Sequence, residues 1–295
     1  MYFESRGFRL HYRRWWVENA LAVVVVSHGL GEHSGRYRAI ARELNAHGYS
    51  VYALDHFGHG QSPGRRGDIE HFSCYSSDLC QFIRAVHHEN PGLGLHLLGH
   101  SMGAVIACDA LVSDEEGVSD EEGAAVDSLI LSAPAFAGSN EPGAFEVSLI
   151  RLLARVCPGL SLSNRLQTEA ISRDPDIVRE YCADDLVHNR VTPRWFLGYR
   201  EAREQLLAHP QTIAFPTLTL LPEGDRLVDP AVTHQWHDRL QGEHHQLRTF
   251  AGAYHEILNE PGSGEEALAA LLEHLRLYTP VSTQQSPPQR LGAGA

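Results

Sequence analysis

Residues 95–104 read Leu95-His-Leu-Leu-Gly-His-Ser-Met-Gly-Ala104, and they are the most informative stretch of this chain. The stretch contains Gly-x-Ser-x-Gly, with an apolar strand pattern before it and a helical pattern after it. A sharp strand-to-helix turn strains the serine backbone and leaves room only for glycine on either side, here Gly99 and Gly103. Such a turn lifts the serine hydroxyl above the sheet, at a helix N-terminus that favours negative charge. The pattern predicts that Ser101 is a nucleophile.

Strand and helix patterns alternate on both sides of this turn. Ala22-Val-Val-Val-Val26 is apolar throughout, which is typical of a strand buried on both faces of a parallel sheet. The alternation predicts a doubly wound α/β fold with a mostly parallel central sheet flanked by helices. After a hairpin over 3–17, we expect strands at 22–26, 50–54, 93–98 and 128–131, and helices at 36–46, 76–88 and 102–112.

The alternation stops near residue 134 and resumes near residue 213. Between them the pattern is mainly helical, without a convincing strand, and beyond them come strands at 216–221 and 246–250 and helices at 230–240 and 265–277. We therefore expect a helical cap inserted between core strands. The expected parts are a first core part at 1–134, a cap at 135–212, a second core part at 213–279 and a disordered tail at 280–295, rich in Pro, Gln, Ser and Gly.

The composition excludes several classes of protein. Of the 295 residues, 43% are hydrophobic, which is ordinary for a globular chain with a sizeable core. All 24 basic residues are arginine, so P-loop, pyridoxal-phosphate aldimine and serine–lysine chemistries are excluded. The net charge of −13 argues against a nucleic-acid partner. Part of that charge comes from a duplicated acidic stretch at 113–117 and 119–123, which we interpret as a solvated loop.

The cysteines and the N-terminal sequence favour a cytoplasmic location. The five cysteines are an odd number without a Cys-x-x-Cys pair, which is typical of free thiols in a reducing environment. Patterned sequence begins directly after Met1, so we expect no signal peptide, and no apolar run approaches the ~20 residues of a membrane span. We expect a cytoplasmic protein, with peripheral contact to a membrane left open.

A serine hydroxyl needs a base, and with lysine absent the base is expected among the 19 histidines. In a fold of this order the acid follows the nucleophile and the histidine follows the last core strand, which selects His255. Asp225 and Asp229 both follow the strand at 216–221. Asp229 precedes Pro230, as a helix N-cap does, so we predict Asp225 as the acid that orients the imidazole.

Acyl transfer also needs two backbone N–H groups that stabilise the negative oxygen of the tetrahedral intermediate. Met102, directly after the serine, is expected to supply one. The loop His28-Gly-Leu-Gly31 follows the strand at 22–26, and Leu30 is the best donor for the second.

Four motifs in this order resemble the monoacylglycerol lipase and lysophospholipase branch of the α/β-hydrolases. They are 28–37 (His-Gly-Leu-Gly-Glu-His-Ser-Gly-Arg-Tyr), 55–62 (Asp-His-Phe-Gly-His-Gly-Gln-Ser), 99–103 and the cap segment 171–188. The resemblance covers about residues 3 to 278, with Asp185 where that branch more usually has proline. It implies an α/β-hydrolase fold, Ser101, Asp225 and His255 as a catalytic triad, and Leu30 and Met102 as oxyanion donors. It implies no metal and no cofactor.

An apolar stripe marks the expected cap helix. Helical spacing places five side chains on one face: Phe145, Leu149, Leu152, Leu153 and Val156. This face is either the lip of an acyl-chain tunnel, or a surface that contacts lipid, or the packing face of the cap on the core. Arg151 and Arg155 lie one turn apart beside it, but the net charge of −13 favours a neutral ester over a phospholipid.

Together these features predict a serine carboxylester hydrolase that cleaves a single-chain lipid ester, monoacylglycerol or lysophospholipid, through an acyl-enzyme. The alternatives are another acyl-transfer enzyme of this fold (esterase, thioesterase, peptidase or acyltransferase) or a lipid-binding homologue without turnover. The histidines at 56, 59, 87 and 88 lack a metal-ligand pattern, and we interpret them as structural.

Overall fold

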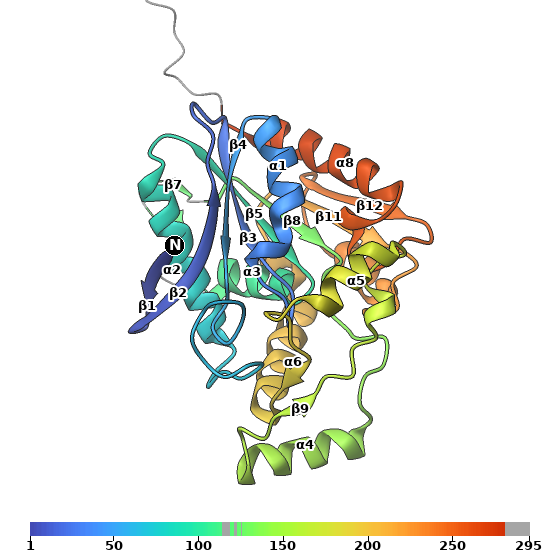
Figure 1. Cartoon of the computed structure of the whole chain (residues 1–295). Helices are drawn as coiled ribbons and strands as arrows, with labels where there is room; N and C mark the ends of the chain where they lie inside the picture. The colour runs from blue at the N-terminus through green and yellow to red at the C-terminus, as the bar shows by residue number, and fades with distance from the viewer. Residues whose placement is uncertain (114–118, 121–122, 125, 281–295) are drawn as a thin grey trace, which may run out of the picture.

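Eight strands form one sheet in the computed structural model, which describes residues 1–113, 119–120, 123–124 and 126–280 (Figure 1). Their order is β1-β2-β4-β3-β5-β8-β11-β12. The pairs β1–β2 and β2–β4 are antiparallel, and the other neighbours are parallel. The strands are β1 Tyr2–Ser5, β2 Phe8–Trp15, β3 Ala22–Ser27, β4 Tyr49–Leu54, β5 Gly94–His100, β8 Ser128–Ser132, β11 Thr217–Pro222 and β12 His245–Phe250.

Helices cover both faces of this sheet, and β3 shows how the two sides are divided. Val23 and Val25 belong to one buried cluster, with residues of α2 and α3, whereas Val24 and Val26 belong to a second, with residues of α1 and α8. The run of valines in β3 is explained by this burial, because a strand covered on both faces needs apolar side chains on both. The helices are α1 Arg38–Ala46, α2 Ser73–Glu89, α3 Met102–Ser113, α4 Ala144–Val156, α5 Pro175–Ala183, α6 Pro193–Ala208, α7 Pro230–His237 and α8 Ser263–Tyr278.

Between β8 and β11 the chain leaves the sheet and forms α4, α5 and α6 beyond one end of it (Figure 1). α6 contacts both α3 and α4. Two short strands, β9 Leu162–Ser163 and β10 Arg190–Val191, pair within this segment. We predicted no strand here, because two residues are too few to show the alternation that identifies a strand. A further short pair, β6 Ser119–Asp120 and β7 Gly123–Ala124, begins in the second copy of the acidic duplication and ends one residue beyond it.

The predicted fold class, a mostly parallel sheet flanked by helices, is confirmed. The element bounds differ by a few residues. α2 begins at Ser73 instead of residue 76, and α7 ends at His237 instead of residue 240. Most of the acidic duplication and the tail from residue 281 lie outside the described residues. No helix in the part of the chain that the structure describes is long and apolar enough to cross a lipid bilayer.

The turn between β5 and α3 packs against the end of β3. Ser101 lies in this turn with a φ of 54°, in the left-handed region that is strained for residues other than glycine. A Cβ atom on Gly103 would lie 2.0 Å from the carbonyl oxygen of Ser27, and one on Gly99 would lie 2.6 Å from the Cα of Ala104. The two glycines therefore allow β5, α3 and β3 to approach closely enough to support the strained serine.

We expect Gly103→Ala to lower the free energy of unfolding by about 3 kcal/mol, because the new methyl group overpacks a contact with backbone atoms. Gly143→Ala is the matched control, since Gly143 has a φ of −67° and its Cβ would meet only a Glu146 oxygen at 3.9 Å. The control should lose no more than about 1 kcal/mol. Urea unfolding measures both variants, and equal losses would contradict the packing argument.

Candidate active site

Three loops bring Ser101, Asp225 and His255 together. Ser101 lies in the turn after β5, Asp225 in the loop after β11 and His255 in the loop after β12. His255 Nε2 lies 2.9 Å from Ser101 Oγ, and His255 Nδ1 lies 2.6 Å from Asp225 Oδ2. The carboxyl ends of parallel strands meet at one edge of a sheet, so residues far apart in the sequence converge there. The three side chains form one hydrogen-bonded chain.

Backbone donors hold the Asp225 carboxylate in place. Its Oδ1 accepts hydrogen bonds from the N–H groups of Leu227 at 2.8 Å and Val228 at 3.1 Å. Burial opposes ionisation of Asp225, but His255 and these donors lower its pKa overall. Asp229 instead accepts from the N–H of Ala231 at 2.9 Å and caps α7. Of the two candidate acids, the structure therefore brings only Asp225 to His255.

Buried charges surround the imidazole of His255. Burial favours its neutral form, but Asp225, Glu256 and Glu32 outweigh this effect and raise the pKa of His255. His100, the residue before Ser101, has its ring centroid 4.9 Å from that of His255. Burial lowers the pKa of His100 to about 4, and its Nδ1 lies 3.1 Å from the carbonyl oxygen of Ser132. His100 is thus a neutral neighbour of His255 near neutral pH.

The two predicted oxyanion donors, Leu30 and Met102, lie beside Ser101. Both residues line the same pocket as Ser101 and His255. Neither backbone N–H donates a hydrogen bond to another of the described residues. Several bonds hold the loop that carries Leu30. The N–H of Gly29 donates to Glu32 Oε1 at 2.7 Å, His28 Nδ1 lies 2.7 Å from the Gly29 carbonyl oxygen, and the Gly31 carbonyl oxygen accepts from the His188 N–H at 2.8 Å. Both residues thus border the pocket of Ser101, and neither backbone N–H has a backbone acceptor among the described residues.

A pocket of about 300 Å³ opens above these residues. It is lined both by the loops at the edge of the sheet and by the segment between β8 and β11. Aromatic and aliphatic side chains form much of its wall, among them Leu166, Ile171, Val191, Trp195 and Phe196. A pocket of this size and lining accommodates a small apolar ligand with its reactive group next to Ser101.

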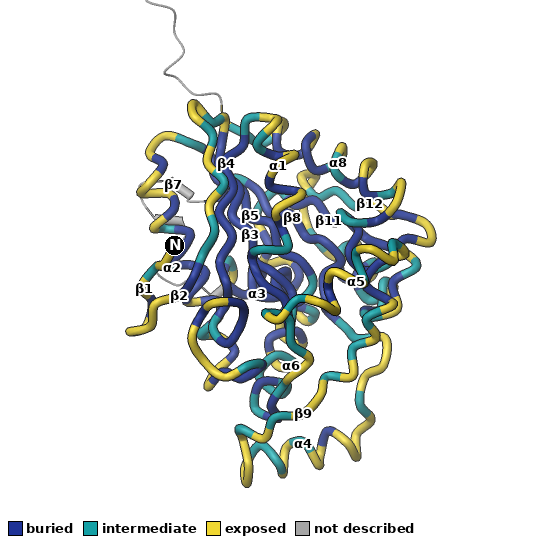
Figure 2. Tube along the Cα trace, in the orientation of Figure 1, coloured by how far each residue is buried: buried dark blue, intermediate teal, exposed yellow. Residues whose placement is uncertain are grey.

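The apolar stripe on α4 does not line this pocket. Phe145 is 82% exposed, and Leu149, Leu152 and Val156 are also exposed, while Leu153 is partly buried. Figure 2 shows that α4 is largely exposed. Four of the five side chains therefore neither pack on the core nor form the wall of the cavity. The exposure of these four side chains argues against the packing interpretation, and contact of the stripe with lipid stays a prediction.

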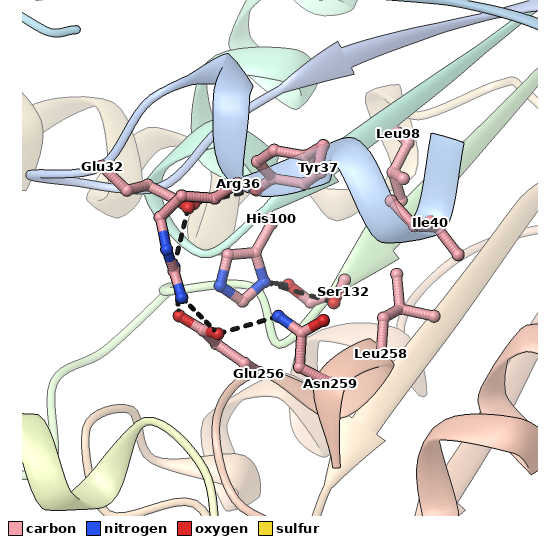
Figure 3. A pocket seen from close by; sticks show the side chains of 10 residues that line it. All are labelled: Glu32, Arg36, Tyr37, Ile40, Leu98, His100, Ser132, Glu256, Leu258 and Asn259. Carbon is pink, nitrogen blue, oxygen red and sulfur yellow. Dashed lines mark hydrogen bonds and ion pairs between the residues drawn. The ribbon is translucent and has the colours of Figure 1, made fainter. Parts of the chain in front are cut away.

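Two loops of the site are joined by buried ion pairs that the sequence motifs do not indicate (Figure 3). Arg36 contacts Glu32, which follows the loop of Leu30, and Glu256, which follows His255, around a second cavity of about 30 Å³. Burial alone would raise the pKa of Glu32, but Arg36, His100 and His28 bring it down to about 2. Glu32 and Arg36 belong to the motif at residues 28–37, but only the folded structure places Glu256 opposite them.

His56 and His59 are buried residues of the loop after β4. His56 Nε2 lies 2.9 Å from Ser27 Oγ, and His59 Nδ1 lies 3.1 Å from the Phe57 carbonyl oxygen. Within the described ranges, no three His, Cys, Asp or Glu side chains form a group suited to a metal ion. His56 thus joins its loop to the end of β3, whereas His59 bonds within its own loop.

Known proteins resemble this chain over most of its length. The Hydrolase_4 family model, described as serine aminopeptidase S33, matches residues 18–262. The monoacylglycerol lipase of Mycolicibacterium smegmatis is 33% identical over 86% of this chain and 89% of its own length. The human monoglyceride lipase is 32% identical over 81% of this chain and 77% of its own length.

A solved structure agrees with these relatives. The crystal structure of the Paleococcus ferrophilus monoacylglycerol lipase superposes with a TM-score of 0.79 and 32% identity, over 91% of this chain and 99% of that one. The chain therefore belongs to the Hydrolase_4 (serine aminopeptidase S33) family and, within the α/β-hydrolase superfamily, to the monoacylglycerol lipase branch.

Proposed function

We propose that this protein is a serine hydrolase that cleaves the carboxylic ester of a single-chain lipid, a monoacylglycerol or a lysophospholipid. The observation that carries the proposal is the hydrogen-bonded chain Asp225–His255–Ser101 at the base of an apolar pocket of about 300 Å³. The names of the relatives, monoacylglycerol and monoglyceride lipases, support the substrate class.

The proposed reaction has two steps. Ser101 Oγ attacks the ester carbonyl while His255 Nε2 takes its proton, and the N–H groups of Leu30 and Met102 donate hydrogen bonds to the resulting oxyanion. The ester C–O bond breaks, and the alcohol leaves with the proton from His255. In the second step His255 takes a proton from water, the hydroxyl attacks the acyl-enzyme, and the proton returns to Ser101 as the fatty acid is released. Asp225 stabilises the imidazolium in both steps.

We further propose that residues 135–212 act as a cap and that α4 contacts a lipid surface. Much of the apolar wall of the pocket comes from this segment. The exposed stripe on α4 has Arg151 and Arg155, which are also exposed, close beside it. An apolar face bordered by arginines is typical of a helix that lies in the interface of a membrane. A lipid substrate would then reach the pocket without crossing water.

The assignment of the nucleophile is tested by covalent labelling. A fluorophosphonate probe should label the wild-type protein, because His255 activates Ser101, and Ser101→Ala should not be labelled. Mass spectrometry of the labelled peptide identifies the modified residue. Equal labelling of Ser101→Ala would contradict the proposed nucleophile.

Hydrolysis rates for monoacylglycerols, lysophospholipids and short p-nitrophenyl esters then decide among the ester classes.

The two aspartates after β11 are tested as a pair. Asp225→Asn should lower kcat by about 10³–10⁴-fold, because the amide neither holds the required imidazole tautomer nor stabilises the imidazolium. Asp229→Asn should keep kcat within about threefold, since asparagine also serves as a helix N-cap. Steady-state hydrolysis of a p-nitrophenyl ester measures both variants. The opposite ranking would show that the acid is assigned wrongly.

Membrane contact is tested with a matched pair of leucines. Leu152 is 57% exposed in the α4 stripe, and Leu277 is 61% exposed on α8. Leu152→Glu should weaken binding to phosphatidylcholine vesicles by about tenfold, since one leucine buried in lipid contributes about 1.5–3 kcal/mol. Leu277→Glu should bind vesicles as the wild type does, and both variants should hydrolyse a soluble ester normally. Equal vesicle binding by both would contradict contact through α4.

A further inference from the structure

Arg36 forms a bridge between the two loops that carry the reacting groups. Its Nη1 and Nη2 donate to Glu256 Oε1 at 2.5 Å and Oε2 at 2.9 Å, and Nη1 also donates to Glu32 Oε2 at 3.0 Å. All three side chains are nearly buried, with exposed fractions of 12% or less. Figure 3 shows the guanidinium between the two carboxylates, with the ring of His100 beside them.

Each end of the bridge is attached to a catalytic loop. Glu32 Oε1 accepts hydrogen bonds from the Gly29 N–H at 2.7 Å and from the Tyr37 hydroxyl at 2.8 Å, so it holds the turn that presents Leu30. At the other end, Glu256 directly follows His255 in the chain. The bridge therefore connects the loop of an oxyanion donor to the loop of the base.

Hydrogen bonds to Asn259 and Ile171 also hold Glu256. Its Oε2 accepts from Asn259 Nδ2 at 2.9 Å, and its backbone N–H donates to the Ile171 carbonyl oxygen at 2.7 Å. A buried carboxylate with this many hydrogen-bond partners is held in one geometry. Removing one partner of a buried ion pair leaves the charge of the other partner uncompensated. The residue after His255 is thus fixed from three directions.

The bridge leaves an excess of negative charge beside His255, because two carboxylates share one guanidinium. Both Glu256 and Glu32 favour the imidazolium and add to the effect of Asp225 in raising the pKa of His255. His100 packs on the imidazole but is neutral, because burial lowers its pKa to about 4. The charged or titratable groups that surround His255 are Asp225, His100, Glu32, Arg36 and Glu256.

We propose that Glu256 is a positioning residue: through Arg36 and Glu32 it fixes His255 relative to the oxyanion donor at Leu30 and supplies negative charge that stabilises the imidazolium. The inference rests on the proposed hydrolase function and extends it. Glu256 lines the pocket next to His255, and its proposed role is exerted through His255. Neither its sequence position nor the four motifs assign it this role.

Two substitutions separate the geometric part of this role from the electrostatic part. Glu256→Gln keeps the length of the side chain but removes the charge and one acceptor, whereas Glu256→Asp keeps the charge and shortens the reach to Arg36. Both should lower kcat by about tenfold with KM within about twofold, because the base is held less closely in its reactive position. The acid limb is the part of the pH–activity profile in which activity falls as the pH decreases. Only Glu256→Gln should shift this limb, and the shift should be toward lower pH.

The sign of that shift follows from the protonation state that reacts. Only neutral His255 takes the serine proton, so activity falls as the pH drops through the pKa of His255. Glu256 raises that pKa, and removing its charge lowers it. The rate of fluorophosphonate labelling as a function of pH reports this limb directly, because it requires Ser101 and His255 but no identified substrate.

Two control variants carry the same change of charge elsewhere. Glu260→Gln alters a buried carboxylate of the same loop, which binds Arg173 and the Tyr254 N–H, and it should lower the melting temperature without moving the acid limb. Glu273→Gln, on the surface of α8 with a side chain 70% exposed, should change neither. An equal pH shift in Glu260→Gln would overturn the proposal, because loosening of the loop would then explain it.

The remaining outcomes are also decisive. Wild-type kcat and an unmoved acid limb in Glu256→Gln would overturn the role of Glu256 while labelling at Ser101 still supports the hydrolase function. Absence of labelling in the wild type would instead overturn that function. If Glu256→Gln does not fold, Glu256→Asp decides: a lower kcat at unchanged KM supports the positioning role, and a wild-type kcat overturns it.

Discussion

The close packing of the turn between β5 and α3 against the end of β3 is the constraint on which the rest of the site depends. Ser101 has a left-handed backbone conformation that is unfavourable for serine, and it is held there because Gly103 lies against the backbone of Ser27. The same contact brings the start of α3 next to the loop that carries Leu30. The proposed nucleophile and the two proposed oxyanion donors are therefore positioned by one packing interaction between three elements of the core.

Charge is arranged around this turn in buried pairs. Asp225 faces His255, and Arg36 lies between Glu32 and Glu256. Burying so many ionised groups is unfavourable unless each has a partner and further hydrogen bonds, and backbone N–H groups supply several of these bonds here. The same partners that make burial tolerable also orient the imidazole, so stabilisation and positioning of the site have one physical source.

Most of the fold was predictable because its signals are local. Buried parallel strands are continuous apolar runs, and Asp229 followed by Pro230 indicates the start of α7, which the structure places there. The strand β9 was not predictable, because two residues show no period. The order of motifs selected His255 and Asp225, but Glu256 gave no signal, since its partner Arg36 lies 220 residues away in the sequence. The stripe on α4 could be recognised as amphipathic, whereas its exposure depends on what the rest of the chain leaves uncovered.

The amino-acid sequence by itself determined the fold class, the residue types capable of the chemistry and the exclusion of amine chemistry, since the chain has no lysine. These properties follow from periodicity, spacing and composition, which are carried by neighbouring residues. Tertiary structure alone decided that Glu32 and Glu256 lie near His255 in addition to Asp225, that the α4 stripe lies outside the pocket, and that one arginine joins the loops of Glu32 and Glu256. Those facts depend on distances between segments far apart in the chain, and such distances exist only once the sheet has brought the ends of its strands to one edge.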